Sequence, residues 1–274
     1  MAVVTAVMTL VLILAGGFVT TTKTGDTIPE WPRSWGRMEA GWPVEWTHRA
    51  VAGVVGLLVL ALAILLQRTD PRPLVRRLGW IALAAVLVQA LLGGLRIYTL
   101  HRAAVAIVHA CFAQLVFCIM VGVAVLASRN EARGPAEGRT IGFAATVMAF
   151  LQLVAGTVTR HTGAGFEVHV AGAVGVMLLS SLFASRLTMT PLHWGGRLLM
   201  GLLAVQILLG FATWMITRDA GFERSVQAPA LSLAVVSAHV ALGASILAAS
   251  LVLTLKCARR TAEEALPALE AARS

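Results

Sequence analysis

Five side chains in this sequence could do chemistry in an apolar environment: one carboxylate and four imidazoles. Glu45 and His48 lie three residues apart in the stretch EWTHR, so on a helix they share one face. His109, His169 and His239 also lie in, or at the edge of, long apolar stretches. An imidazole can ligate a metal or carry a proton, and a carboxylate can act as a general base. Which role each group can take depends on the elements that position it.

The composition is that of an integral membrane protein. Of the 274 residues, 58% are hydrophobic and only 13% are charged. The mean hydropathy of +0.83 is too high for a water-soluble domain of this length. Because a helix needs about 20 apolar residues to cross a bilayer, the sequence predicts an all-α polytopic membrane protein with eight transmembrane helices. The predicted spans are roughly 2–19, 50–66, 78–95, 103–127, 141–158, 168–184, 198–216 and 231–255.

The positive charge of the chain fits cytoplasmic loops better than a nucleic-acid partner. The formal net charge is +9, and basic residues are typically enriched on the cytoplasmic side of polytopic proteins. If the N-terminus is inside, more of the 22 Lys and Arg residues fall in inner loops than in outer ones. We therefore expect a bacterial inner-membrane protein with both termini in the cytoplasm and no nucleic-acid binding. No basic segment precedes the first apolar stretch, so we interpret it as a span and not as a signal peptide.

Several landmarks recur along the chain in the same order. The hexapeptide VQALLG at 88–93 recurs as VQILLG at 205–210, and GFVTTTKTG at 17–25 is similar to GTVTRHTG at 156–163. The histidines follow the same plan, so we interpret the chain as two four-helix halves related by duplication and oriented alike in the membrane. The predicted divisions are an N-terminal half at 1–127 with a long outer loop at 20–48, a cytoplasmic linker at 128–140, a C-terminal half at 141–256 and a cytoplasmic tail at 257–274.

The four histidines are predicted to form two pairs near the outer face. Since the even-numbered spans run inward, His48 and His169 lie at outer ends, while His109 and His239 lie roughly 10 Å deep. A single histidine in a span can also simply hydrogen-bond a neighbouring helix. Two imidazoles on facing helices match the axial ligands of a haem iron, whereas zinc or copper would need further ligands. The sequence therefore predicts two haem sites.

The two predicted haem sites differ by one acid. Aligning His48 with His169 places Phe166 where Glu45 stands, although Glu167 is adjacent. Glu45 could simply stabilise the N-terminus of its helix, or it could supply proton chemistry to one site only. Haem propionates would need cations near the outer interface, where such residues are otherwise common. The candidates are Lys23, Arg49, Arg96, Arg102, Arg160, Arg218 and Arg224.

These residues resemble the heme A synthase family. The resemblance is carried by GGFVTTTKTGDTIPEWP at 16–32, the ExxH element of EWTHR, His109, and the second histidine pair, and it covers nearly all of the chain. It implies a membrane-bound oxidoreductase that oxidises the C8 methyl group of haem O to the formyl group of haem A, for cytochrome oxidase assembly. Some members carry a cysteine pair in outer loops, which this sequence lacks.

The resemblance also assigns roles to the residues. It implies that His48 and His109 are axial ligands of the substrate haem O in the N-terminal half, and that His169 and His239 are axial ligands of a haem b cofactor in the C-terminal half. Glu45 matches an acid that is functionally important in the family. The implied partners are haem O, membrane lipid, a quinol or other electron donor, haem O synthase, oxidase assembly factors and further copies of this chain.

Two other functions remain open at this point. A di-haem b-type electron carrier linked to quinol would also use two histidine pairs, but it needs neither an acid beside one iron nor an exchangeable haem. A transporter built from parallel repeats would place polar groups near the bilayer midplane. The polar groups of this chain gather toward one leaflet instead, which favours a haem protein.

Overall fold

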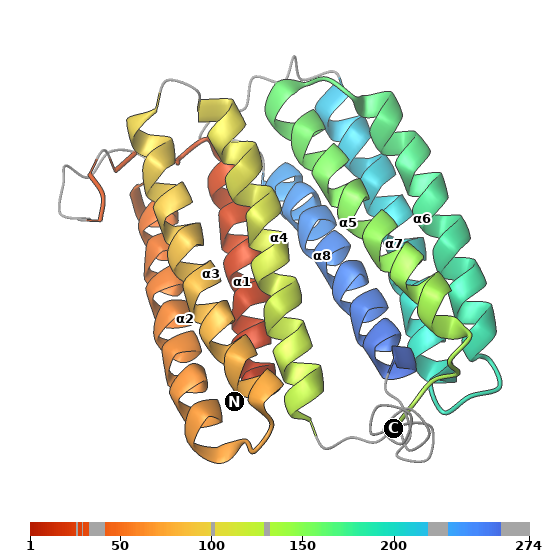
Figure 1. Cartoon of the computed structure of the whole chain (residues 1–274). Coiled ribbons are helices and arrows are strands. Elements are labelled where there is room, and N and C mark those ends of the chain that lie inside the picture. The colour runs from red at the N-terminus through yellow and green to blue at the C-terminus, as the bar shows by residue number, and fades with distance from the viewer. Residues whose placement is uncertain are drawn as a thin grey trace.

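The chain folds into long helices. The structure, a computed structural model, describes residues 1–25, 27–28, 30–32, 42–99, 102–128, 132–218 and 230–258. Within these residues there is no strand, and eight helices are long and apolar enough to cross a membrane. This confirms the predicted all-α membrane protein (Figure 1). The helices are α1 (Ala2–Thr21), α2 (Trp42–Thr69), α3 (Pro73–Tyr98), α4 (Arg102–Ala127), α5 (Gly138–Thr162), α6 (Phe166–Leu187), α7 (His193–Arg218) and α8 (Ala230–Ala258).

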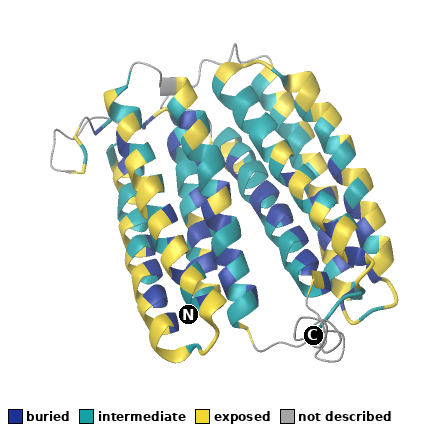
Figure 2. Ribbon diagram, viewed as in Figure 1, coloured by how far each residue is buried: buried dark blue, intermediate teal, exposed yellow. Residues whose placement is uncertain are grey.

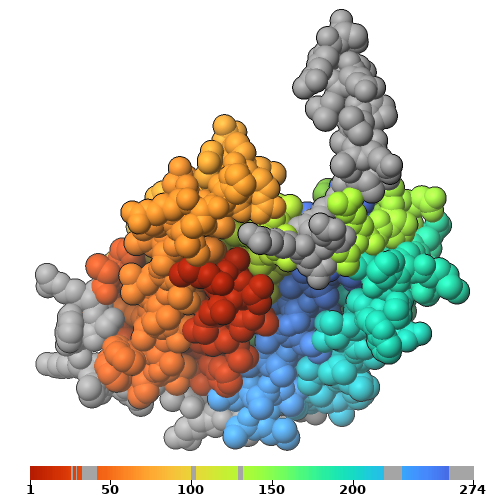
Figure 3. All heavy atoms as spheres, turned by 90° about the horizontal axis from the view of Figure 1, so that it is seen from below, coloured from red at the N-terminus to blue at the C-terminus, as the bar shows by residue number. Residues whose placement is uncertain are grey.

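The helices stand side by side in two groups. Figure 1 shows α1–α4 on one side of the molecule and α5–α8 on the other. Between the groups, α8 packs against α1 and α4, and α4 packs against α5. Seen from the end where α1 begins, α1 lies between α8 and the pair formed by α2 and α3 (Figure 3). The duplication of the two halves, and the cytoplasmic location of this end, stay predictions.

The outer surface of the helices is apolar. Leu57, Leu91, Leu178 and Leu208 are 60–69% exposed, and other large hydrophobic side chains share this outward orientation. Buried residues lie mainly where helices face one another (Figure 2). Lipid is as apolar as leucine, and a helix satisfies its own backbone hydrogen bonds, so this surface suits a bilayer.

Two helix starts place predicted site residues inside helices. α2 begins at Trp42, several residues before the predicted span, so Glu45 and His48 both lie in its first two turns. α6 begins at Phe166 after a tight turn in which Gly163 and Gly165 have φ angles of 75° and 80°. Glycine adopts this left-handed conformation without steric cost. The turn places the start of α6, which carries His169, against the end of α5.

The connection between α2 and α3 is held by an ion pair. Arg72 donates to the Asp70 carboxylate at 2.6 Å and to the backbone carbonyl of Leu126, near the end of α4, at 2.8 Å. Hydrogen bonds from Arg72 lower the pKa of Asp70 to about 2. The pair is therefore ionised at neutral pH and links this turn to α4.

Candidate functional site

The four histidines lie on the four even-numbered helices. His48 is on α2, His109 on α4, His169 on α6 and His239 on α8, and all four are half-buried. The His169 and His239 ring centres are 6.3 Å apart, with their planes at 79°. His48 and His109 are near enough to interact electrostatically. The structure thus brings His169 and His239 into direct proximity and places His48 in the neighbourhood of His109.

The spacing of the second pair suits a metal held between two rings. An imidazole nitrogen lies about 2 Å from a metal that it ligates and the ring centre about 1 Å farther, so two rings on opposite sides of one ion have centres about 6 Å apart. The 6.3 Å between His169 and His239 matches this arrangement.

Several imidazole nitrogens retain the capacity to bind a ligand. The Nδ1 atoms of His48, His109 and His239 are buried and have no hydrogen-bond partner within the described part of the chain. Such atoms are rare in folded proteins, because an unpaired buried nitrogen costs free energy. The described residues contain no group of three or more His, Cys, Asp or Glu side chains placed to hold a metal ion. Pairs of imidazoles instead fit a haem, whose porphyrin supplies the other iron ligands.

Each histidine ring lies against a glycine of the helix that precedes it. We call these glycines the seat glycines. A Cβ atom built on any of them would stand closer to the imidazole Cε1 atom than nearly all real Cβ contacts allow. The distances from such a Cβ to the imidazole Cε1 atom are 3.2 Å for Gly16 and His48, 3.2 Å for Gly93 and His109, 2.8 Å for Gly156 and His169, and 3.1 Å for Gly210 and His239.

Glutamine side chains hold two of the histidines. Gln89 donates from Nε2 to the backbone carbonyl of His109 at 3.0 Å, and the same nitrogen is 3.3 Å from the ring Nε2. Gln152 donates to the backbone carbonyl of His169 at 2.8 Å and lies 3.1 Å from the ring Nδ1. These contacts fix the helix backbone at each histidine and the orientation of its ring.

Each of these glutamines stands four residues before a seat glycine, so both residues lie on one helix face. The same Gln-x-x-x-Gly pattern occurs in α7, at Gln206 and Gly210, whereas α1 has Leu12 where the glutamine would stand. Sequence reasoning missed the glutamines and glycines. The signal was present, because the recurring hexapeptides VQALLG and VQILLG each contain one glutamine and one seat glycine.

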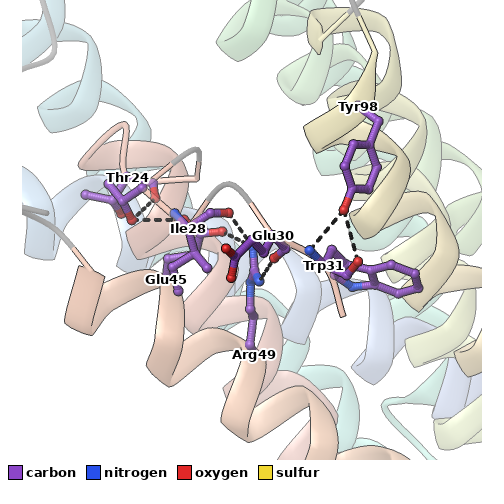
Figure 4. A network of polar contacts seen from close by, with 8 residues as sticks. Thr24, Ile28, Glu30, Trp31, Glu45, Arg49 and Tyr98 are labelled. Atoms are coloured by element: carbon purple, nitrogen blue, oxygen red, sulfur yellow. Dashed lines mark hydrogen bonds and ion pairs between the residues drawn. The ribbon is translucent and has the colours of Figure 1, made fainter. Parts of the chain in front are cut away.

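Glu45 lies at the centre of a polar network between α2 and the chain that follows α1. The residue is only 4% exposed, and its carboxylate accepts hydrogen bonds from the Thr27 hydroxyl at 2.9 Å and the Ile28 backbone N–H at 3.0 Å. Arg49, one turn farther along α2, forms an ion pair with it at 2.6 Å and donates to the carbonyls of Ile28 and Glu30 (Figure 4). Glu45 and Arg49 therefore attach Thr27, Ile28 and Glu30 to the N-terminal end of α2.

The same segment is attached to α3. The Tyr98 hydroxyl accepts a hydrogen bond from the Trp31 N–H and donates one to the Trp31 carbonyl, each at 3.0 Å (Figure 4). The Trp31 ring lies over Gly94, where a Cβ would stand 2.5 Å from it. Gly94 adjoins Gly93, the seat glycine of His109. The segment thus connects the N-terminal end of α2 with the C-terminal end of α3.

The candidate cations take several roles. Arg160 on α5 donates to the Gly17 carbonyl at 3.0 Å and to the Thr21 hydroxyl at 2.5 Å, both on α1. The Arg96 guanidinium packs against Gly25, and Arg218 lies 5.0 Å from the centre of the Trp214 ring. Arg224 and the side chain of Arg102 lie outside the described residues.

A separate apolar groove contains none of the four histidines. It has a volume of about 370 Å³, lies between α1, α4 and α8, and is lined by residues such as Val7, Phe117, Val252 and Lys256. The chemistry-bearing side chains are therefore concentrated at the histidine pairs and the Glu45 network.

Comparisons with known proteins point to one family. Residues 37–175, just over half of the chain, match the model of the COX15-CtaA family, described as cytochrome oxidase assembly protein. This segment includes Glu45 and three of the four histidines.

Curated relatives are similar at low identity. The heme A synthase of an Exiguobacterium species is 27% identical over 60% of this chain and 57% of its own length. That of Bacillus pumilus is 31% identical over 48% of this chain and 47% of its own length. That of Shouchella clausii is 23% identical over 89% of this chain and 84% of its own length. The chain thus spans about half the length of the first two relatives and most of the third.

Proposed function

We propose, on the premise that this chain belongs to the heme A synthase family of cytochrome oxidase assembly proteins, that it is an enzyme of haem A biosynthesis. The proposed reaction is oxidation of the C8 methyl group of haem O to the formyl group of haem A. The proposed setting is a bacterial cell membrane, with both termini in the cytoplasm. Because the reaction removes electrons from the methyl carbon and adds an oxygen atom, it needs an oxidant, and a quinol or another electron donor can be the redox partner only together with dioxygen.

The observation that carries the proposal is the pair formed by His169 and His239. Their ring centres are 6.3 Å apart and the Nδ1 atom of His239 is buried without a partner among the described residues. We assign these two residues to a haem b cofactor, and His48 and His109 to the substrate haem. A bound haem b supplies one-electron transfer.

The residues around the first pair suit a reaction kept from water. Glu45 and Arg49 hold Thr27, Ile28 and Glu30 to α2, and Tyr98 holds Trp31 to α3, so the backbone of these four residues lies at the proposed outer ends of the two helices. Exclusion of water strengthens the electrostatic interactions of any charge inside.

Glu45 is proposed to act through its charge. Three donors, from Thr27, Ile28 and Arg49, already occupy its oxygens. We assign to this carboxylate the stabilisation of positive charge that develops at the oxidised methyl carbon. Proton acceptance is the second role that the resemblance allows.

The experiment that tests the function is identification of the bound haems. The protein is purified from membranes, and its haems are extracted and identified by chromatography and mass. We expect haem b together with haem O, a hydroxylated intermediate or haem A. Haem b alone, at two per chain, would instead identify a di-haem electron carrier.

A further inference from the structure

The seat glycines do not serve the backbone of their helices. Gly16, Gly93, Gly156 and Gly210 all lie inside helices, and none has a positive φ. A glycine inside a helix costs about 0.5–1 kcal/mol of stability relative to alanine. Four such positions, each facing an imidazole, therefore need another reason.

Close approach of two helix backbones does not supply that reason. A Cβ at Gly79 would meet the Cα atom of Ala63 and one at Gly196 the carbonyl of Ala184, whereas one at Gly195 would meet the side chain of Leu253. At the seat glycines the atoms within 4 Å of a Cβ are imidazole atoms and nothing else among the nearest three. The space at these positions is kept for the ring.

We propose that the four seat glycines are positioning residues, which hold each imidazole ring in the orientation that it needs to ligate a haem iron. The inference rests on the proposed function, since it takes the rings as axial ligands. Gly156 is the most demanding seat, because a Cβ there would stand 2.8 Å from His169, compared with 3.1 Å at Gly210.

A ligated ring and a free ring respond differently to a methyl group at the seat. A free imidazole at the end of a side chain can rotate away from it. A ring whose nitrogen is bound to iron has no such freedom, so the clash must be taken up by a tilted or longer bond to the metal. Alanine in place of a seat glycine should therefore weaken haem binding much more than it destabilises the haem-free protein.

The test compares Gly156→Ala with Gly201→Ala. Gly201 lies on α7 with nothing within 4 Å of a built Cβ, so it controls for the helix-stabilising effect of alanine. Each full-length variant is prepared with haem, and also from cells that cannot make haem. The readouts are haem b per chain, the electron paramagnetic resonance signature of the low-spin iron, and the thermal unfolding temperature of the haem-free protein.

We expect Gly156→Ala to bind haem b roughly 10- to 100-fold more weakly, the range lost when residues that orient a metal ligand are changed. Its haem-free form should unfold at or above the wild-type temperature. At Gly210 the distance from a built Cβ to the imidazole is larger, so Gly210→Ala should keep its haem but shift the resonance signature. Gly201→Ala should match the wild type in haem content and spectrum.

Two outcomes would overturn the inference alone. One is a Gly156→Ala protein with normal haem b content and an unchanged signature. The other is a Gly156→Ala protein that is destabilised equally with and without haem, which would make Gly156 a packing residue. Wild-type protein that binds no haem under any preparation would overturn the proposed function itself, together with the inference.

Discussion

Glu45 combines a structural role with a proposed chemical one, and substitutions can separate the two. Glu45→Gln keeps an oxygen that can accept from Thr27 and Ile28 but removes the negative charge. We expect this variant to keep the haem b of the C-terminal half while losing conversion of haem O, because charge stabilisation is lost. The measurement is chromatography of the haems made by membranes that carry each variant.

The control for Glu45 is Thr27→Val, which removes one neutral hydrogen bond and leaves the carboxylate in place. Such a bond contributes about 1 kcal/mol, so most conversion should remain. Glu45→Ala should also stop conversion, but it removes the carboxylate that Arg49 binds and should cost as much as about 3 kcal/mol of stability. Normal haem A production by Glu45→Gln would show that the charge has no role in the reaction.

The sequence alone was enough to find the histidines, but not what surrounds them. A histidine in an apolar stretch is rare, so four of them in a recurring order could be recognised by type and spacing alone. Glycine, leucine and valine are common in any membrane helix, so the recurring hexapeptides did not reveal that Gly93 and Gly210 face imidazoles. That contact depends on the rotation of α3 against α4 and of α7 against α8, which no single-helix pattern specifies.

At the scale of elements, α3 holds the segment that follows α1. The Tyr98→Phe substitution removes both hydrogen bonds to Trp31 and leaves the ring. Because Tyr98 is 63% exposed, water can replace the lost partner, and we expect a small change in global stability, about 1 kcal/mol or less. The local effect should be larger, with faster amide hydrogen exchange in residues 27–32.

A matched control is available at the other end of α3. Trp80→Phe removes an exposed hydrogen bond to Gln67 at 3.2 Å and should leave exchange in residues 27–32 unchanged. Hydrogen exchange followed by mass spectrometry would measure both variants. Equal exchange in Tyr98→Phe and the wild type would mean that Glu45 and Arg49 alone hold the segment.

The helices themselves were predictable because hydropathy and length are local properties. Their ends were not, since the polar residues of EWTHR gave no reason to begin a span at Trp42. There the helix is extended by interactions from outside it, when the chain after α1 pairs with Glu45 and Arg49. This is why the predicted outer loop at 20–48 included the first turns of α2.

At the scale of the whole molecule, Arg160 joins the two groups of helices. Helix α1 packs against α2, α4 and α8, and Arg160 reaches it from α5. One of its partners, Gly17, adjoins Gly16, the seat glycine of His48, and the positive charge of Arg160 is near enough to act electrostatically on His239. One cation is therefore placed to influence both proposed haem sites.

Replacing Arg160 by Met should have two separable effects. Loss of the hydrogen bonds to Gly17 and Thr21 should lower the free energy of unfolding by about 1–3 kcal/mol, as expected for bonds to a charged donor. Loss of a positive charge near His239 should lower the midpoint potential of the haem b that this residue is proposed to ligate, because a cation stabilises the reduced form.

Two further variants, Arg160→Lys and Arg139→Met, distinguish the effect on stability from the effect on the midpoint potential. The lysine keeps the charge but not the planar guanidinium, so it should restore most of the potential and less of the stability. Arg139, exposed at the other end of α5, should change neither quantity when replaced by Met. Redox titration and thermal unfolding of the purified proteins measure the two effects. If the potential is the same in Arg160→Met and the wild type, the charge of Arg160 does not act on the second site, and its role is confined to joining α5 to α1.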